Sequence, residues 1–428
     1  MQIAEDWVEN PILAGTNHKT LKDAAPRHAA TNAVIHAAFA ATGIVTVLLG
    51  PILPILISRW SFTDERAGFL FVSQYIGQLA GSLSTGLIIP IRRFGYRLTF
   101  AIGFALIAIG VAALSVGSER FGLPGTALYG YGLGLALSGG NLWVAEIFPT
   151  RRAPAVSILN VTWTAGAIAC GPLVMLAERA HMLRTFLVTV AVFMGVCALV
   201  IAVREIEPPG HFVDKSSLEK DFAVQVIAGS SANESVGFAA TRKIHSPVAL
   251  ALASLFFLYV GTETAVGGWV AAYANRVEAV SAMMSALTPA FFWGGLLTGR
   301  ALAPVFLRTI AEKILVASGL GLAMFSVGGV MYATNYRMAI FCAVLAGLGL
   351  ACVYPILVGW MVKTYGVHAR QFGSLLFACG GLGGAMLPWL VGIVSTHDGG
   401  LRAGLLVPIA ACVVMSLVNV IYSQRFAS

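Results

Sequence analysis

Charge is the scarcest property of this sequence. Only 11% of its 428 residues are Asp, Glu, Lys or Arg, while 58% are hydrophobic. Soluble domains carry about 25% charged residues, which help to keep their surfaces in water. The composition therefore argues against a soluble domain and predicts a membrane protein in contact with a lipid bilayer.

Motifs for catalysis and metal binding are also missing. The sequence has no HExxH, no GxSxG and no glycine-rich nucleotide loop, so we expect neither an enzyme nor a bound cofactor. Its six cysteines fall inside apolar stretches and form no CxxC pair, which argues against a disulfide framework and a zinc site. The formal charge is +8, but the basic residues are scattered singly, so no nucleic-acid partner is predicted.

What the chain does have is a series of long apolar runs. A helix needs about 20 apolar residues to cross a bilayer. Twelve runs approach that length, at about 32–57, 67–90, 97–117, 123–146, 154–177, 184–203, 247–272, 282–305, 313–333, 338–361, 371–394 and 403–423. Twelve transmembrane helices are therefore predicted.

A polar stretch divides these spans into two groups of six. Residues 204–246 contain "DKSSLEKDF" and "GSSANES" and are expected to form a cytoplasmic linker. We expect an N-terminal bundle at 31–203 and a C-terminal bundle at 247–424. Residues 1–30 lack the short apolar core of a secretory signal and are expected to be a cytoplasmic N-terminal lead.

Two internal matches indicate that the halves are repeats. "GSLSTGLIIP" (81–90) aligns with "GLLTGRALAP" (295–304) at an offset of 214, and "GLGLA" (132–136) aligns with "GLGLA" (347–351) at an offset of 215. An all-α membrane protein of two six-helix bundles follows. Parallel repeats about an axis along the membrane normal are a transporter architecture, with the substrate site near the midplane between the halves.

The basic residues predict the orientation. If both termini are cytoplasmic, 18 of the 27 Lys and Arg residues lie on cytoplasmic segments, 8 lie on external ones, and Arg300 lies in the eighth span. Cytoplasmic loops of membrane proteins are enriched in Lys and Arg. The N- and C-termini are therefore predicted to be cytoplasmic.

Amide and aromatic side chains inside the spans are candidates for substrate contact. Small and hydroxyl residues at such positions are typical of helix packing, but Gln74, Asn141 and Asn160 have more hydrogen-bonding capacity than packing needs. An amide can donate to and accept from sugar hydroxyls. Trp163 lies one turn from Asn160 and offers a flat apolar face to a sugar ring. Three further aromatic side chains could extend this surface: Tyr259, Trp269 and Trp293.

One carboxylate, Glu263, lies within the seventh span in "FLYVGTETAVGGW" (257–269). Burial there disfavours its charged form and favours a protonated carboxyl. A carboxyl that loads and releases a proton at this depth suits a proton-coupled carrier, so Glu263 is the candidate proton-coupling residue. A structural carboxyl bonded to a neighbouring helix is the alternative.

Charged residues near the cytoplasmic ends of the spans are candidates for a gate. "AEIFPTRR" (145–152) places Glu146 near Arg151, and Arg300 follows Trp293 on the eighth span. Ion pairs among these residues would latch the inward side. Anchoring to lipid phosphate is an equally good explanation.

Together these segments resemble the fucose–galactose–glucose:proton symporter family of the major facilitator superfamily. "LLGPILPIL" (48–56) looks closest to its glucose/mannose permease branch. The other matching segments are "SGGNLW" (138–143), "LNVTWTAGAIACGPL" (159–173), "FLYVGTETAVGGW" (257–269), "FFWGGLLTGR" (291–300), "GLGLACVYP" (347–355) and "GGLGGAMLP" (380–388). The resemblance implies the major facilitator fold, alternating access and a central sugar site. It also implies functional roles for five residues: Asn141, Asn160, Glu263, Trp269 and Arg300.

The chain departs from this family at two acidic positions. Fucose-type members carry an Asp in the first span, where this chain has His36, and an acid in the fourth span, where it has Leu137 and Ser138. Glu263 would then couple transport alone. We expect a monomer in the cell's inner membrane that moves a monosaccharide in symport with a proton. The alternatives are sodium coupling, uniport and, less well supported, a drug/proton antiporter.

Overall fold

A computed structural model describes residues 18–89, 95–147, 152–204, 247–277, 280–365 and 369–427, and the regular structure in these ranges is helical. The helices of the first half are α2 (His18–Val47), α3 (Leu49–Trp60), α4 (Asp64–Ile88), α5 (Gly95–Ser115), the short 3₁₀ helix η2 (Glu119–Phe121), α6 (Gly122–Ile147), α7 (Arg152–Arg179) and α8 (Leu183–Val203). Residues 18–30, expected to belong to a lead, are helical as the start of α2.

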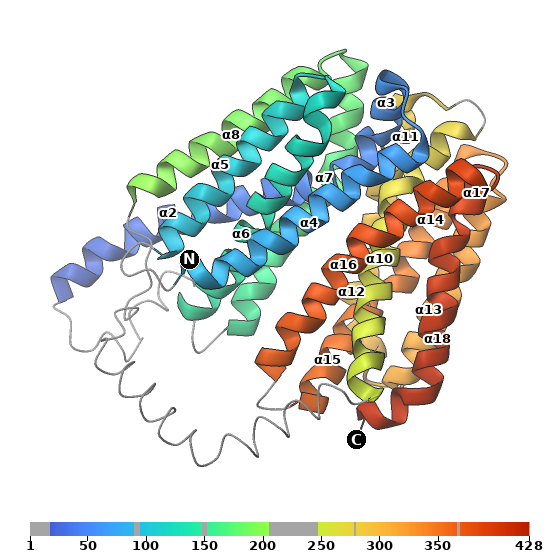
Figure 1. Ribbon diagram of the computed structural model, residues 1–428. Helices are drawn as coiled ribbons and strands as arrows, with labels where there is room; N and C mark the ends of the chain where they lie inside the picture. Colours follow the sequence, from blue (N-terminus) through green and yellow to red (C-terminus); the bar gives the residue numbers. More distant parts are fainter. Residues whose placement is uncertain are drawn as a thin grey trace.

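The second half repeats this plan. Its helices are α10 (Pro247–Arg276), α11 (Ala282–Ser285), α12 (Thr288–Phe306), α13 (Glu312–Met331), α14 (Tyr336–Ala351), α15 (Val353–Tyr365), α16 (Ala369–His397), α17 (Leu401–Gly404) and α18 (Leu406–Ala427). The predicted linker lies outside the described residues apart from Arg204. The two halves form two separate helical bundles (Figure 1).

The twelve predicted spans are confirmed as helices or broken helices. Eight segments pass as spans by length and hydropathy among the described residues, and the bent pair α2–α3 raises this number to nine. The other three predicted spans are α4, α6 and α12, with 25, 26 and 19 residues. Glutamine and serine side chains lower the hydropathy of α4, glycine lowers that of α6, and Arg300 and two prolines lower that of α12.

Proline explains where four of the spans are broken. A proline has no N–H for the carbonyl four residues before it, and its ring clashes with that carbonyl. In each case the first piece ends four residues before a proline: Val47 before Pro51, Ser285 before Pro289, Ala351 before Pro355, and Gly404 before Pro408. The α2–α3 break bends the first span by 44°.

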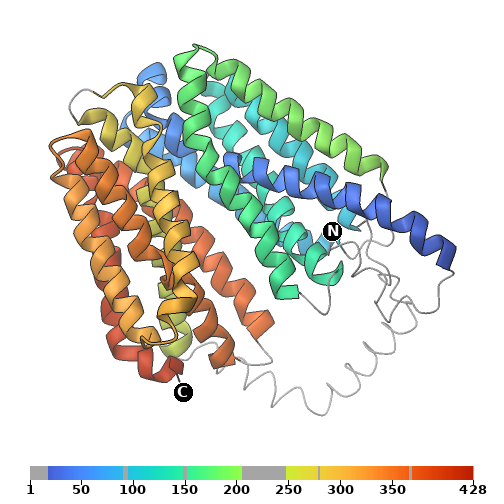
Figure 2. The ribbon, with the colours of Figure 1, turned by 180° about the vertical axis from the view of Figure 1, so that it is seen from behind.

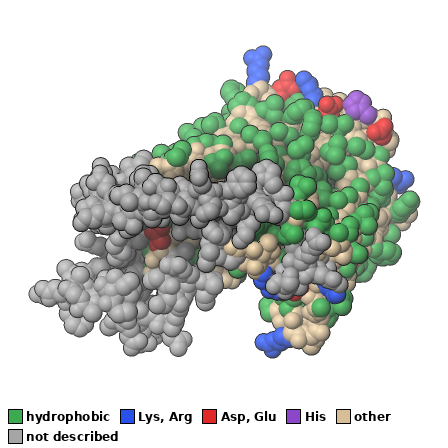
Figure 3. All heavy atoms as spheres, turned by 60° about the horizontal axis from the view of Figure 1, so that its bottom comes forward, with side chains coloured by type: hydrophobic (Ala, Val, Ile, Leu, Met, Phe, Trp, Pro, Cys, Tyr) green, Lys and Arg blue, Asp and Glu red, His purple; other side chains and the backbone are tan. Residues whose placement is uncertain are grey.

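Apolar side chains cover the outside of the bundles. Phe325 on α13, Val420 on α18 and Leu250 on α10 are 78%, 76% and 73% exposed, which would be costly in water. Figure 3 shows a face covered by hydrophobic side chains, with charged groups gathered at its margins. This pattern is that of a multi-pass membrane protein whose surface contacts lipid.

The two bundles meet at one end and diverge at the other. They come together near α3, α11 and α17, and they separate toward the end where α8 finishes and α10 begins (Figures 1 and 2). We call these the closed end and the linker end. The contacts between the halves run mainly through α4 with α16, α10 with α3, and α12 with α7.

Candidate functional site

A pocket lies between the bundles on the side of the closed end. Both halves line it, and the lining residues with polar or aromatic groups are Thr46, Phe71, Tyr75, Thr264 and Trp293. Gly267 and Gly268 on α10 complete its wall and leave backbone where side chains would fill the space. The pocket is therefore formed only while the two bundles are together.

A hydrogen bond crosses the pocket between the bundles. The Thr264 hydroxyl lies 2.7 Å from the Val260 carbonyl and 3.2 Å from the Tyr75 hydroxyl. Because a carbonyl can only accept, Thr264 donates to Val260 and the Tyr75 hydroxyl donates to Thr264. The Tyr75 oxygen keeps its acceptor capacity toward the pocket.

Two indoles from opposite bundles meet beside this bond. Trp163 on α7 and Trp293 on α12 pack edge to face, with ring centroids 6.2 Å apart. Trp163 Nε1 donates to the Thr46 hydroxyl at 3.3 Å, and Thr46 donates to the Thr42 carbonyl at 2.7 Å. Trp293 Nε1 is buried and has no hydrogen-bond partner among the described residues.

The predicted amide residues Asn141 and Asn160 come together as a pair. Asn160 Nδ2 donates to Asn141 Oδ1 at 3.1 Å and to the Val156 carbonyl at 2.8 Å. Asn141 Nδ2 donates to the Leu137 carbonyl at 2.9 Å. Asn160 is exposed and Asn141 is half-buried, so this polar pair is accessible although both residues lie within predicted spans.

Glu263 is neutralised by a partner from another helix of its own bundle. Arg300 Nη2 on α12 donates to Glu263 Oε1 at 3.0 Å and to the Tyr259 hydroxyl at 3.3 Å. The side chains of Arg300 and Glu263 are 29% and 13% exposed. Pairing compensates for the cost of two charges at this depth. Arg300 therefore lies beside the candidate coupling residue, and its buried Nε has no partner among the described residues.

Other predicted residues lie away from the pocket surface. Gln74 is fully buried: its Nε2 donates to the Thr46 carbonyl at 2.9 Å, and its Oε1 accepts from Tyr129 at 2.8 Å. Trp269 is also buried and donates to the Pro388 carbonyl at 2.8 Å. Glu146 is exposed near the end of α6, and Arg151 lies outside the described residues.

Of the polar and aromatic pocket residues, the sequence analysis named only Trp293; for Tyr75 and Thr264 it named the neighbouring residues Gln74 and Glu263. Neighbouring residues on a helix point about 100° apart. On α4 the face that meets the other bundle contains Phe71 and Tyr75, while Gln74 points into its own bundle. The sequence analysis chose the face of α4 that carries Gln74, whereas the face that meets the other bundle carries Tyr75, one residue further along.

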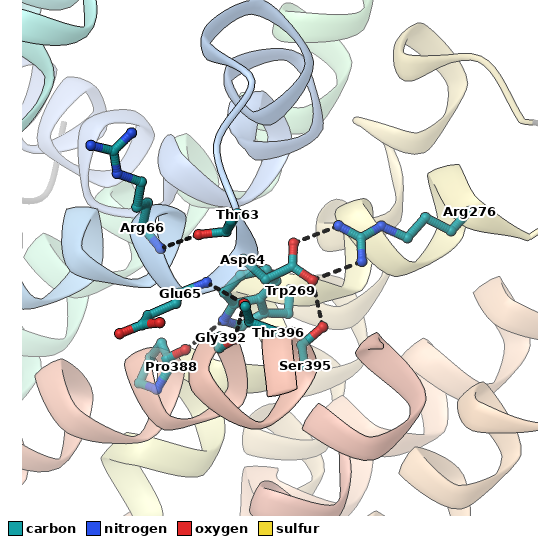
Figure 4. A network of polar contacts seen from close by, with 10 residues as sticks. All are labelled: Thr63, Asp64, Glu65, Arg66, Trp269, Arg276, Pro388, Gly392, Ser395 and Thr396. Carbon is teal, nitrogen blue, oxygen red and sulfur yellow. Dashed lines mark hydrogen bonds and ion pairs between the residues drawn. The ribbon is translucent and has the colours of Figure 1, made fainter. Parts of the chain in front are cut away.

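A polar network joins the bundles at the closed end (Figure 4). Asp64 begins α4, and Arg276 ends α10. The two Arg276 nitrogens contact the two Asp64 oxygens at 2.8 and 2.5 Å, and Ser395 on α16 also donates to Asp64. A charge-assisted bidentate pair is strong and has a defined geometry. Each charge also faces the favourable end of its helix dipole.

Two further contacts extend this network along α16. The Glu65 backbone N–H donates to the Thr396 hydroxyl at 2.9 Å, and His397 Nε2 lies 3.3 Å from a Glu65 carboxylate oxygen. No sequence motif links these residues, because Asp64 and Arg276 are 212 positions apart.

Glycine allows the bundle backbones to touch near this network. A methyl group at Gly50 on α3 would lie 2.7 Å from the Gly267 carbonyl oxygen, and one at Gly392 on α16 would lie 2.4 Å from the Asp64 carbonyl oxygen. Contacts under 3.0 Å to backbone cannot be relieved by moving a side chain. Closure at this end therefore depends on the absence of side chains at both positions.

The fold and this arrangement agree with a family match. The family model of the Major Facilitator Superfamily matches residues 35–335. The chain belongs to the major facilitator superfamily. The match begins in α2 and ends in the loop before α14, so it covers the first bundle and part of the second.

Individual members of the superfamily are similar over most of the chain. The sodium-dependent glucose transporter 1 of Homo sapiens is 22% identical over 402 residues, covering 84% of this chain and 72% of that protein. The glucose/mannose transporter GlcP of Bacillus subtilis (strain 168) is 23% identical over 365 residues, covering 85% of this chain and 87% of that protein. The resemblance noted from the motifs is thus confirmed.

A solved structure confirms the major facilitator fold. The crystal structure of a D-xylose-proton symporter has a TM-score of 0.71 with 15% identity, and the match covers 91% of this chain and 96% of that one. In this major facilitator protein, the pocket and the Asp64–Arg276 contact lie between the two bundles. The Asn141–Asn160 pair joins α6 and α7 within the N-terminal bundle.

Proposed function

We propose that the chain is a secondary transporter that carries a monosaccharide of the glucose, mannose or fucose type across a membrane by alternating access. The observation that carries this proposal is the pocket between the bundles, which in the state described here has room for about one water molecule and would widen to admit a sugar when the bundles move apart. Tyr75 and Trp293 reach it from opposite halves, so a bound molecule would touch both and sense their relative position. The names of the human and Bacillus subtilis relatives support a sugar as that molecule.

The chemistry of the lining suits a sugar better than a lipophilic cation. A monosaccharide presents hydroxyls that both donate and accept, together with a C–H face that packs on aromatic rings. Hydroxyl and indole groups lie in the pocket, and the Asn141–Asn160 amide pair is accessible. We propose that Asn160, Asn141 and Trp163 contact the sugar from the N-terminal bundle, and that Trp293 does so from the C-terminal one.

Gln74, Trp269 and Tyr259 act indirectly in this proposal. Gln74 fixes α4 against α2 and α6, and Trp269 fixes α10 against α16. Tyr259 accepts from Arg300 and thereby holds its guanidinium beside Glu263. These residues position the groups that line the path.

The Glu263–Arg300 pair suggests how a proton would be coupled to the sugar. While the pair is formed, the Arg300 guanidinium stabilises the negative charge of the Glu263 carboxylate. If the pair separates in another state of the cycle, the buried carboxyl favours the protonated form. Glu263 would then load a proton in one state and release it when Arg300 returns. Sodium is the alternative coupling ion, which the name of the human relative favours.

The closed end faces the outside in this proposal. The excess of Lys and Arg on the opposite segments supports a cytoplasmic location for both termini and the linker. The state described here is then closed outside, with Asp64 and Arg276 forming the external latch. Glu146 and Arg151 would belong to the latch of the opposite, outward-facing state. We propose a monomer in the cell's inner membrane, because the path lies between the chain's own two bundles.

Entrance counterflow in liposomes tests the proposal without assuming a coupling ion. Purified protein is reconstituted in vesicles loaded with one unlabelled sugar, and uptake of the same sugar in labelled form is followed. Glucose, mannose, galactose and fucose are compared, with a lipophilic cation as a control substrate. We expect transient accumulation of at least one sugar and none of the cation. Counterflow of the cation alone would overturn the proposal.

A further inference from the structure

Three successive residues at the end of α16 contact the beginning of α4 at the closed end. Ser395 donates to the Asp64 carboxylate. The Thr396 hydroxyl accepts from the Glu65 backbone N–H at 2.9 Å, and His397 Nε2 lies 3.3 Å from Glu65 Oε2. Because α16 belongs to the C-terminal bundle and α4 to the N-terminal one, these contacts exist only while the two bundles are together at this end.

The charges that meet across the bundles depend on the protonation of His397. The N-terminal bundle contributes the carboxylates of Asp64 and Glu65. Asp64 is contacted by Arg276, whose guanidinium stays positive at all ordinary pH values. Glu65 is contacted by His397, whose imidazole is positive only when protonated. Histidine is the side chain that ordinarily changes charge between pH 5 and 8.

The positions of both residues on their helices favour the charged pair. His397 is the last residue of α16, and Glu65 is the second residue of α4. Helix termini favour a cation at the C-terminal end and an anion at the N-terminal end. The two side chains are 63% and 36% exposed, so the imidazole can exchange protons directly with the solution on that side.

Charged groups of the C-terminal bundle are poor reporters of whether this end is closed. Asp398 follows His397 directly, Arg402 lies on α17, and Arg276 ends α10. All three belong to the same bundle as His397. Their distances from the imidazole therefore change little when the two bundles move apart.

On the opposite bundle, Glu65 is the charge that His397 gains on closure. The neighbouring Asp64 is already engaged in its bidentate pair. Arg66 faces the Phe62 ring, with its Cζ 5.5 Å from the ring centroid. Figure 4 shows the Arg66 guanidinium pointing away from α16. A positive imidazole thus attracts Glu65 only in the closed arrangement.

We propose that His397 is a pH-sensitive contact of the closed end: protonation of its imidazole strengthens the pairing with Glu65 and stabilises the state in which the bundles are together there. In the orientation proposed above this side is the outside, so external acid favours external closure. The device is separate from coupling through Glu263, because His397 lies at the end of a helix and Glu263 lies within α10. It does not depend on which molecule is transported.

Two substitutions of His397 test its charge. His397→Gln is neutral and His397→Lys is positive between pH 5 and 8. Spin labels at the exposed positions 119 and 334, one on each bundle, measure the closed-to-open ratio in a cysteine-replaced background. From pH 8 to pH 5, we expect this ratio to rise about 3-fold more with His397 present than in His397→Gln, the size expected of an exposed ion pair. His397→Lys should lack the extra rise and should already have the higher ratio at pH 8.

Two further variants keep the test specific. Glu65→Gln removes the other partner and should also abolish the extra rise, so the test remains valid if a His397 variant misfolds. His181→Gln is the matched control, because His181 is an exposed histidine in the turn between α7 and α8. It should leave the extra rise unchanged.

Three results would overturn the inference. An equal rise with and without His397 would assign the pH response to another group. A His397→Lys variant that behaves like His397→Gln would show that the charge at this position has no effect on closure. Loss of the extra rise in His181→Gln would indicate a general effect of surface charge. No sugar is present in these measurements, so failure of the proposed function would not change their outcome.

Discussion

Glu263 and Arg300 place opposite charges inside helices that cross the bilayer, where a single unpaired charge is costly. Their contact at 3.0 Å explains how the span tolerates the carboxylate, and the Tyr259 hydroxyl helps to hold the guanidinium. The same pairing gives the carboxyl two states, paired and unpaired. A residue with two such states can link proton binding to movement of helices.

Replacing only Glu263 or only Arg300 should reduce the stability of the protein more than replacing both. Glu263→Gln or Arg300→Gln leaves one charge without its partner and should reduce stability by about 3 kcal/mol, whereas the double variant should lose less. The measurement is the thermal unfolding midpoint of purified protein in detergent. If the two single losses simply add in the double variant, the ion pair is not a stabilising unit.

The Asn141–Asn160 pair gives a second residue-level prediction. Asn160→Ala removes a group that contacts the sugar in our proposal and should weaken sugar binding by about 1–3 kcal/mol. Asn141→Ala should have a similar effect, and the double variant should lose less than the sum because the two amides are bonded to each other. Calorimetric titration of the variants measures this coupling. Unchanged affinity in all three would place the pair outside the site.

The sequence predicted individual residues better than their partners. Glu263 was recognisable because a carboxylate stands out in an apolar span, but Arg300 lies 37 positions away and was assigned to a gate. Gln74 was selected for its hydrogen-bonding capacity, and the structure uses that capacity on Thr46 and Tyr129. Only packing decides which face of a membrane helix meets the other bundle, and no local pattern records it.

At the scale of helices, the end residues of α4 and α10 hold the closed end together. Asp64 is the first residue of α4 and Arg276 is the last residue of α10, so the pair joins two helix termini from different bundles. Gly50 and Gly392 bring the backbones into contact beside it. The ion pair attracts the bundles to each other, and the two glycines allow their backbones to approach closely because they have no side chains.

Weakening this pair should open the closed end. Asp64→Asn removes the charge that Arg276 contacts and should shift the population away from the closed state. Spin labels at the exposed positions 119 and 398, in a cysteine-replaced background, report the separation of the bundles there. We expect a longer distance component in Asp64→Asn and none in the control Arg66→Gln, which removes a nearby charge that faces Phe62 instead. Equal distributions in both variants would exclude a latch.

Helix boundaries were more predictable than helix contacts. Apolar runs in the sequence located all twelve spans, including α4, α6 and α12, whose hydropathy is lower, because membrane helices must be long and largely apolar whatever they touch. The breaks each lie four residues before a proline, but other prolines lie inside continuous helices, so proline permits a break and does not by itself predict one. The contact between Asp64 and Arg276 follows no local rule, since it depends on how two bundles lean together.

At the scale of the whole molecule, two repeats of one plan form both the path and the machinery that opens it. The pocket and the closed-end network both lie between bundles of the same chain. Nothing in this arrangement requires a second copy. The movement that exposes the site to either side is then a change in the angle between the bundles.

A monomer should therefore be fully active. Reconstitution at decreasing protein-to-lipid ratios, until most vesicles hold one molecule or none, should leave the uptake rate per molecule unchanged. Single-molecule bleaching of fluorescently labelled protein counts the copies in each vesicle. A rate per molecule that falls as single copies come to dominate would show that the active unit is an oligomer.

The most direct measurement of the central claim is the accumulation of labelled sugar by proteoliposomes under an imposed gradient. The account predicts accumulation of a monosaccharide above its external concentration when the outside is more acidic, and none without a gradient. Glu263→Gln should still exchange labelled for unlabelled sugar but should fail to accumulate it, because its amide cannot release a proton. Accumulation that depends on a sodium gradient and not on pH would support the sugar as substrate and identify sodium as the coupling ion. Normal accumulation by Glu263→Gln would show that the carboxyl has a structural role. Absence of sugar movement in every condition, by protein that is folded and correctly inserted, would contradict the account.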